Sequence, residues 1–165
     1  DPIVNWSNNL KFYTSILKIS TSHPKILFVL KSKNYDWIKI PHFKNIYRCF
    51  KKQKNVIFFK KNYQITNYQM IQNVDFSIAK YTSLVDDFLM NHKPVIICED
   101  VPFVKDFIKY DKSIVVEDYK TLDQCVLKLE SNFSKFNSSL NLMRKKYFKQ
   151  FYLPNFQKKL RKILK

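Results

Sequence analysis

Residues 74–89, VDFSIAKYTSLVDDFL, change from one hydrophobic pattern to another with no loop in between. The first part, 74–79, is a short apolar run typical of a buried strand. Apolar residues then recur at the three- and four-residue spacing of a helix, at Leu84, Val85, Phe88 and Leu89. Thr82 or Ser83 stands where such a helix takes its N-cap. A strand that leads directly into a helix is the building unit of a parallel α/β sheet, so this segment indicates the fold class.

The segments on either side continue this alternation of strands and helices. We predict further strands at 25–30, 55–59, 94–98 and 113–116. We predict helices at 6–20, 43–50, 67–73 and 103–110, and a helical region at 121–165 with a break near 152–154. Thr121 is the expected cap of that last region. The pattern predicts a single α/β domain over 1–165: a Rossmann-like parallel sheet with helices on both faces and a C-terminal helical extension at 121–165.

The composition excludes intrinsic disorder and raises the question of an anionic partner. Hydrophobic residues make up 45% and aromatic residues 16% of the 165 residues, which is enough to bury a core. The formal net charge is +17, and a basic surface attracts phosphate. The chain nevertheless lacks Gly, has few Arg and is rich in Lys, Asn and Ile, so an AT-rich genome explains part of the charge. Because Arg and Gly-containing loops usually accompany nucleic-acid recognition, we expect a partner other than nucleic acid.

The cysteines and the absence of long apolar runs bear on location. Cys49, Cys98 and Cys125 are widely spaced, with no CxxC pair, which indicates a reduced cytoplasmic setting and no metal site. No run approaches the roughly 18 apolar residues that a membrane span needs. The chain begins with Asp1 and not with Met, so we expect it to be part of a longer, two-domain protein.

Polar side chains follow three of the predicted strands, at the sheet edge where open α/β sheets bind ligands. They are Lys31 and Lys33, then Tyr81, Thr82 and Ser83, and finally Glu99 and Asp100. Asp87 lies in the first turn of the helix that follows Ser83. Cations and a helix N-terminus suit phosphates, and acids suit ribose hydroxyls, so the set predicts a nucleoside diphosphate site. The alternatives are solvated lysines, an ordinary N-cap and an acid that complements the helix dipole.

The segments 75–88 and 93–97 together resemble a known family. They are similar to the C-terminal, donor-binding half of GT-B fold transferases that build bacterial surface polymers, the CDP-glycerol glycerophosphotransferase and capsular polysaccharide glycosyltransferase group. The resemblance implies that Tyr81, Thr82 and Ser83 form the turn that holds the donor phosphates. It also implies that Asp87 faces the ribose or glycerol end of the donor, and that Lys31 is the basic residue that closes the first strand. Glu99 and Asp100 are further candidates for ribose or sugar contacts.

The chain departs from this family at one functional loop. The glycerophosphotransferases carry Lys-Pro-His-Pro where residues 31–34 read Lys-Ser-Lys-Asn, so we assign no catalytic residue. The resemblance implies transfer of a sugar or polyol phosphate from a nucleotide-sugar or CDP-polyol donor to a polysaccharide or lipid-linked acceptor. It implies no cofactor beyond the donor substrate, and a cytoplasmic location, peripheral on the inner face of the membrane.

The distribution of basic residues leaves two alternatives open. The basic segments 144–149 and 158–165 contain aromatic and leucine residues, a composition that can bind an anionic membrane surface or pack on the sheet. The rival function is a non-catalytic basic α/β module that binds nucleic acid or another polyanion through lysines such as Lys51, Lys52, Lys60 and Lys61. We expect His23 and His92, each just before a predicted strand, to be turn residues.

Overall fold

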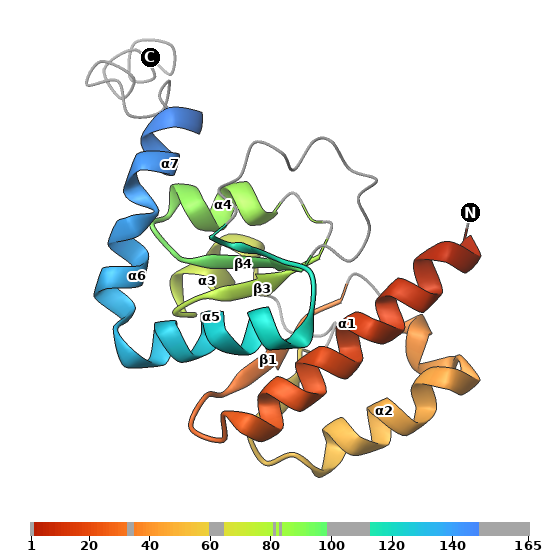
Figure 1. Ribbon diagram of the computed structural model, residues 1–165. Helices are drawn as coiled ribbons and strands as arrows, with labels where there is room; N and C mark the ends of the chain where they lie inside the picture. Colours follow the sequence, from red (N-terminus) through yellow and green to blue (C-terminus); the bar gives the residue numbers. More distant parts are fainter. Residues whose placement is uncertain are drawn as a thin grey trace.

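The computed structural model describes residues 2–32, 35–59, 65–80, 82, 84–98 and 113–148, with side chains for all of these except 2–8 and 147. Helices and strands alternate along this part of the chain, as expected (Figure 1). The elements are α1 (Pro2–Ser22), β1 (Phe28–Leu30), the 3₁₀ helix η1 (Asp36–Lys39), α2 (Pro41–Lys52), β2 (Val56–Phe58), α3 (Asn67–Gln72), β3 (Ser77–Ala79), α4 (Leu84–Met90), β4 (Val95–Cys98), β5 (Val115–Val116), α5 (Tyr119–Ser131), α6 (Phe133–Ser139) and α7 (Asn141–Tyr147).

The strands are all parallel, but they form two small sheets where we expected one. β1 pairs with β2, with Phe28 opposite Val56, and β4 lies between β3 and β5 in the second sheet. The strands are also shorter than the apolar runs that predicted them. The run at 25–30 begins as a turn, because the Ile26 N–H donates to the His23 carbonyl at 3.1 Å, and extended pairing starts only at Phe28. The fold is therefore α/β with two parallel sheets.

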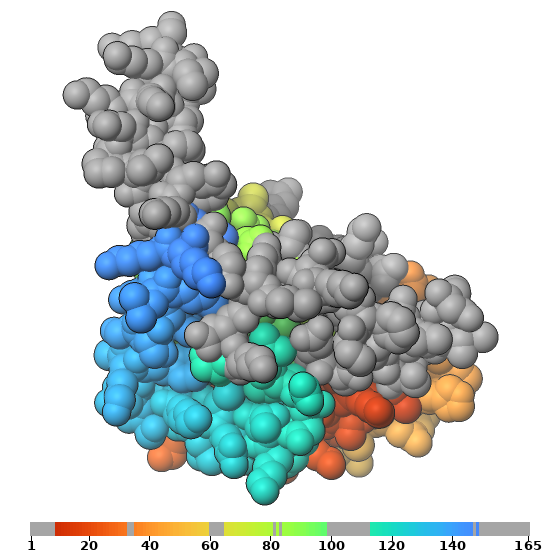
Figure 2. Space-filling model, turned by 45° about the horizontal axis from the view of Figure 1, so that its top comes forward, coloured from red at the N-terminus to blue at the C-terminus, as the bar shows by residue number. Residues whose placement is uncertain are grey.

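Helices cover both faces of the β3–β4–β5 sheet. Because neighbouring strand residues point to opposite faces, Val95 and Ile97 pack into one core cluster and Ile96 into the other. The first cluster contains side chains of α3, α4 and α7, and the second contains side chains of α1, α5 and the β1–β2 sheet. Figure 1 shows β3 and β4 between α4 and α5, and Figure 2 shows α5 beside the α6–α7 pair on one face of the molecule. The expected helices on both faces are thus present.

The C-terminal region differs from the expected continuous helix. It consists of three helices up to Tyr147, because Asn132 and Leu140 interrupt the helical backbone. Asn132 ends α5 and caps α6, since its side-chain oxygen accepts the Lys135 N–H at 2.9 Å. Phe148 is buried in the first core cluster. The expected break near 152–154 and the expected helix at 103–110 lie outside the described residues.

Two helix ends show how local chemistry sets the boundaries. The N-cap of α5 is Asp118 and not Thr121, because the Thr121 N–H donates to Asp118 Oδ1 at 2.7 Å and Thr121 completes a capping box from the N3 position. After α4, His92 adopts a positive φ of 57°, as expected of a turn residue. The Lys93 N–H then donates to the Phe88 carbonyl at 2.9 Å. In a chain without Gly, a histidine therefore occupies the left-handed position that ends the helix.

Arg144 is a buried cation next to Met143 of the first core cluster, although the sequence places it in a basic run. Its side chain is 1% exposed. Its Nε donates to the Leu89 carbonyl at 3.0 Å, near the end of α4, and its Nη1 donates to the Asn137 carbonyl at 2.9 Å, in the last turn of α6. Nη2 donates to Asn137 Oδ1 at 2.7 Å. The Leu89 and Asn137 carbonyls also accept the backbone N–H groups of His92 and Leu140, so the guanidinium adds a second donor to each and joins α4 to α6 and α7.

Among the described residues, no helix combines the length and the apolar character that crossing a membrane requires.

Candidate functional site

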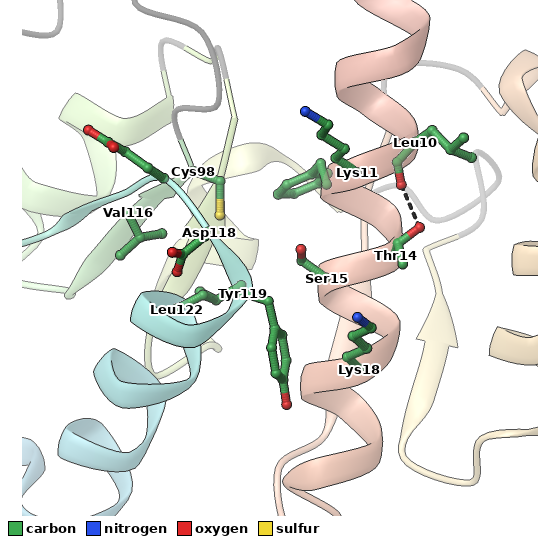
Figure 3. Close-up of a pocket in the computed structure, with 12 residues that line it drawn as sticks. Leu10, Lys11, Thr14, Ser15, Lys18, Cys98, Val116, Asp118, Tyr119 and Leu122 are labelled. Atoms are coloured by element: carbon green, nitrogen blue, oxygen red, sulfur yellow. Dashed lines mark hydrogen bonds between the residues drawn. The ribbon is translucent and has the colours of Figure 1, made fainter.

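A pocket of about 450 Å³ lies between α1 and the ends of β4 and β5 (Figure 3). Cys98 is the last residue of β4 and Val116 the last of β5, so the pocket opens at the carboxyl edge of this parallel sheet. Open α/β sheets bind their ligands at this edge. The lining residues are Leu10, Lys11, Phe12, Thr14, Ser15 and Lys18 from α1, Cys98, Val116, Glu117 and Asp118 from the strand ends, and Tyr119 and Leu122 from α5.

The α1 wall of the pocket carries two cations and a hydroxyl. Lys11, Ser15 and Lys18 are spaced at i, i+4 and i+7, so they share one side of the helix. Figure 3 shows them on the side of α1 that faces the strand ends and α5. The Thr14 hydroxyl instead donates to the Leu10 carbonyl at 2.7 Å within the helix. Ser15 and the two ammonium groups are therefore the groups of this wall that can bind an anion.

Glu117 and Asp118 form the opposite wall, where β5 leads into α5. Two hydrogen bonds from Thr121 lower the pKa of the Asp118 carboxyl below its usual value. The bond from the Thr121 N–H has the larger effect, and the bond from its hydroxyl adds to it. One Asp118 oxygen is thus committed to the helix cap. Glu117 is exposed, and its carboxylate can accept hydrogen bonds from ligand hydroxyls.

Tyr119 connects the two walls. Lys18 Nζ lies 5.3 Å from the centre of its ring, within cation–π range. The Tyr119 hydroxyl lies 3.0 Å from Ser22 Oγ, at the end of α1, and donates to Asp123 Oδ1 at 3.4 Å within α5. The ring is therefore held at the floor of the pocket by contacts with both helices.

Behind Tyr119, His23 lies between two carboxylates. Its Nε2 is 3.1 Å from Asp123 Oδ1 and its Nδ1 is 2.5 Å from Glu130 Oε2, and the His23 side chain is 3% exposed. The sequence identifies His23 only as a turn residue before a strand. Its position after α1 agrees with that reading, but the carboxylate partners are more than 95 residues away along the chain and carry no local signal.

Of the site residues predicted from the sequence, the three that the structure describes do not line this pocket. Lys31 follows β1, Thr82 follows β3 and Asp87 lies in the first turn of α4. Thr82 acts as expected of a cap, because the Leu84 N–H donates to its Oγ1 at 3.2 Å. Asp87 is exposed, and its backbone carbonyl accepts the Asn91 side chain at 2.8 Å. The other predicted site residues, Lys33, Tyr81, Ser83, Glu99 and Asp100, lie outside the described residues.

Lys31 has a defined environment at the carboxyl end of the β1–β2 sheet. Its Nζ donates a hydrogen bond to Asn67 Oδ1 and lies 5.4 Å from the centre of the Phe59 ring. The Tyr35 hydroxyl contacts the Leu30 carbonyl at 2.8 Å and the Phe59 carbonyl at 2.6 Å, and so ties the ends of the two strands together. Burial raises the pKa of Tyr35 above its ordinary value, so it stays a hydrogen-bond donor at neutral pH. Lys31 therefore borders the first sheet at the edge where the sequence places it.

Sequence reasoning missed the pocket residues Lys11, Lys18, Glu117, Asp118 and Tyr119. Two signals were present: the i, i+4, i+7 spacing on α1, and an Asp three residues before Thr121. The described residues contain no group of three or more His, Cys, Asp or Glu side chains arranged to hold a metal ion. Comparison with protein-family models, with curated proteins and with solved structures gives no match. The chemistry of the pocket is therefore the guide to function.

Proposed function

We propose that the chain binds the nucleotide part of an activated donor in the pocket between α1 and α5. It would serve as the donor-binding half of a transferase that moves a sugar or polyol phosphate to a polysaccharide or lipid-linked acceptor. In this proposal the two parallel sheets belong to a Rossmann-like GT-B domain. The observation that carries it is a pocket with two lysines on one wall and two carboxylates on the other, at the carboxyl edge of a parallel sheet.

The pocket groups match the parts of a nucleotide. Its volume of about 450 Å³ is in the range of small-molecule sites. Lys11 and Lys18 supply the positive charge that a diphosphate needs, and Glu117 can accept hydrogen bonds from ribose hydroxyls. The Tyr119 ring offers an aromatic face to a base, because stacking on tyrosine is favourable for any base.

The transfer would depend on electrostatic stabilisation of the leaving group. When an acceptor hydroxyl attacks the anomeric carbon of a nucleotide-sugar, negative charge develops on the departing nucleoside diphosphate. When it attacks the polyol-bearing phosphorus of a CDP-polyol, the charge develops on the departing nucleoside monophosphate. Lysine ammonium groups placed before the reaction stabilise that charge without having to reorganise. The acceptor, and a base to remove its proton, would come from a further domain. In a cytoplasmic setting at the inner face of the membrane, such a domain would meet lipid-linked acceptors.

A binding screen tests the proposal. The chain is titrated by calorimetry with UDP, CDP, GDP, UDP-sugars and CDP-glycerol. We expect one nucleoside diphosphate to bind, and Lys11→Ala with Lys18→Ala to weaken it about tenfold or more, because each removes a charge-assisted contact. Lys128→Ala, on α5 but outside the pocket lining, is the matched control and should bind as the wild type does.

The same screen separates the pocket from the site predicted by sequence. If Thr82→Ala with Ser83→Ala abolishes binding while the lysine pair does not, the donor lies at the turn before α4. If no nucleotide raises the thermal midpoint or releases heat, donor binding by this chain is refuted.

A second candidate function has its own observation. The exposed side of α2 carries four cations and no acid: Lys44, Arg48, Lys51 and Lys52. Among the described residues, no carboxylate lies within 4 Å of any of them. Phe43 and Phe50 are buried on the opposite side, so the charge is presented outward. This arrangement supports the rival function, a non-catalytic module that binds nucleic acid or another polyanion.

The rival is tested with a single-stranded oligonucleotide and with vesicles containing anionic lipid. Replacing the four α2 cations with Gln should abolish salt-sensitive binding to either probe if α2 is the functional surface. Retention of nucleotide binding in the same variant, with no polyanion binding by the wild type, would refute the rival.

A further inference from the structure

A groove of about 410 Å³ lies where α5 meets α6, away from the pocket on α1. It is lined by Lys128 and Ser131 of α5, by Asn132 between the helices, and by Lys135, Phe136 and Ser139 of α6. Its hydroxyls are committed to their own helices, because Ser131 donates to the Lys128 carbonyl at 3.2 Å and Ser139 to the Phe136 carbonyl at 2.6 Å. The two lysine ammonium groups are therefore the charged groups that this groove offers to a ligand.

The outer side of α6 and α7 extends the groove into a wider surface. Lys135 and Ser139 lie one turn apart in α6. Leu142 and Lys146 lie one turn apart in α7. Leu140, between the two helices, keeps right-handed helical torsion angles (φ −81°, ψ −7°), so α7 follows α6 end to end (Figure 1). Leu140 itself is buried, and the side chains one turn apart on the opposite side are exposed.

Exposed leucines lie among these lysines. Leu142 is 81% exposed, more than any other large apolar side chain of the described residues. Leu127, next to Lys128 on α5, is 50% exposed. An apolar patch that a folded domain leaves in water and surrounds with polar residues marks an interaction site. We call Leu127, Lys128, Lys135, Leu142 and Lys146 together the α5–α7 surface; Figure 2 shows these three helices on one face of the molecule.

The α5–α7 surface is positive and has no accessible acid. Between positions 124 and 148 the only acidic residue is Glu130, and its Oε2 is bonded to His23, on the side of α5 that faces α1. Among the described residues, no carboxylate lies within 4 Å of the Lys128 or Lys135 ammonium group. The surface is therefore complementary to a partner that carries negative charge.

The residue types of the surface favour an anionic lipid over nucleic acid. Nucleic-acid surfaces rely on Arg and on aromatic rings that stack on bases, and here the cations are lysines and the apolar groups are leucines. A bilayer accepts both, because leucine enters the boundary of the acyl chains while lysine keeps its ammonium group among the headgroups. The basic segment 144–149 does not provide this surface as a unit, since Arg144 and Phe148 are buried.

We propose that the α5–α7 surface binds an anionic membrane. The groove takes the phosphate of an anionic phospholipid between Lys128 and Lys135, and Leu142 enters the acyl boundary. This contact is independent of the nucleotide pocket, whose lysines lie on α1.

Vesicle flotation tests the proposal. The chain is mixed with phosphatidylcholine vesicles, with or without about 30% phosphatidylserine, at about 0.1 and 0.5 M NaCl. We expect binding only to the vesicles with phosphatidylserine, and its loss at the higher salt concentration. Lys128→Gln with Lys135→Gln should weaken binding about 30-fold, since each lysine near a lipid surface contributes about fivefold. Leu142→Asn should weaken it about tenfold, because the inserted apolar area is lost.

Matched variants separate this surface from general charge and exposure. Leu27→Asn makes the same change at a leucine that is 60% exposed before β1, and it should bind as the wild type does. Lys11→Gln with Lys18→Gln removes the same charge from α1 and should also leave vesicle binding unchanged. Lys128, Lys135 and Leu142 are exposed, so their variants should keep the thermal midpoint of the wild type.

Four outcomes would overturn the proposal. They are no salt-sensitive vesicle binding by the wild type, full binding by the Lys128 and Lys135 variant, an equal loss in the Lys11 and Lys18 variant, and a loss only when the α2 cations are replaced. If oligonucleotide binding depends on Lys128 and Lys135 but vesicle binding does not, the surface binds nucleic acid and the lipid proposal is also overturned. Vesicle binding without any nucleotide binding would uphold this proposal and refute the proposed function of the pocket.

Discussion

Each face of the β3–β4–β5 sheet has one buried cation at its margin, and the two are built differently. Arg144 lies next to Met143 of the core cluster of α3, α4 and α7, and donates to backbone carbonyls and an amide oxygen. His23 borders the cluster of α1 and α5 and faces two carboxylates. One face is therefore joined through neutral acceptors and the other through acids.

The difference follows from what each cation satisfies. Arg144 donates to carbonyls near two helix ends that also accept backbone N–H groups. His23 contacts acids that are partly exposed, with Asp123 at 28% and Glu130 at 32%. Water reaches those acids, so it screens their contacts with His23 more than it weakens the buried hydrogen bonds of Arg144. The pocket lies on the face that contains His23.

Removing Arg144 should have the largest effect. Arg144→Met keeps much of the apolar stem but leaves the Leu89 and Asn137 carbonyls buried without this donor. We expect a loss of about 3 kcal/mol in the free energy of unfolding, since each hydrogen bond from a charged group contributes about 1.5–3 kcal/mol. Urea denaturation measures it. Lys145→Met, at the exposed neighbouring position, is the control and should change stability by less than about 0.5 kcal/mol.

Removing His23 should have an intermediate effect. In His23→Ala the carboxylates of Asp123 and Glu130 lose their shared cation and repel each other. Because both acids are partly exposed, water screens them, and we expect a loss of about 1–2 kcal/mol by urea denaturation. Adding Asp123→Asn and Glu130→Gln should restore part of this loss. A triple variant no more stable than His23→Ala would show that the histidine matters for packing and not for charge.

The sequence predicts the elements of both faces but neither cation. Apolar spacing is a local signal, and it places α1, α4, the start of α5 and every described strand within a few residues. Arg144 stands in a run of basic residues typical of a solvated surface, and burial follows only from the contact of α7 with the end of α4. The contacts of His23 likewise depend on a helix that lies 100 residues further along the chain.

The candidate site shows the same limit of sequence reasoning. Strand order along the chain predicts that loops after the strands meet at one edge, and Cys98 does end a strand at the pocket. Strand order does not predict that α1 lines the pocket, because it does not fix the position of a helix that precedes the first strand. Nothing in the sequence therefore distinguishes Lys11 and Lys18 from the other lysines of the chain.

Removing the N-cap of α5 should have a smaller effect on stability, and that effect should depend on pH. Hydrogen bonds from Thr121 lower the folded-state pKa of Asp118, so the carboxylate form stabilises the fold above the ordinary aspartate range. That contribution is lost as the pH falls through the folded pKa, below about pH 4. Asp118→Asn, which keeps a good N-cap, should reduce the change in thermal midpoint between neutral and acid pH relative to the wild type. Asp118→Ala should lower the midpoint already at neutral pH, and an unchanged midpoint there would contradict the cap.

The smallest expected effect is the coupling between the two faces. Val95 and Ile97 of β4 face one core cluster and Ile96 the other, so a rigid strand separates Arg144 from His23. Phe136 of α6 packs against both clusters and is the contact through which a disturbance could pass. A double-mutant cycle with the mild variants Arg144→Lys and His23→Gln measures this coupling by urea denaturation. We expect the free-energy changes to add within about 0.5 kcal/mol, as they do for sites without shared partners. A larger coupling that disappears in Phe136→Ala would mean that Phe136 transmits the loss of Arg144 to His23, and that the pocket side of the sheet depends on both faces.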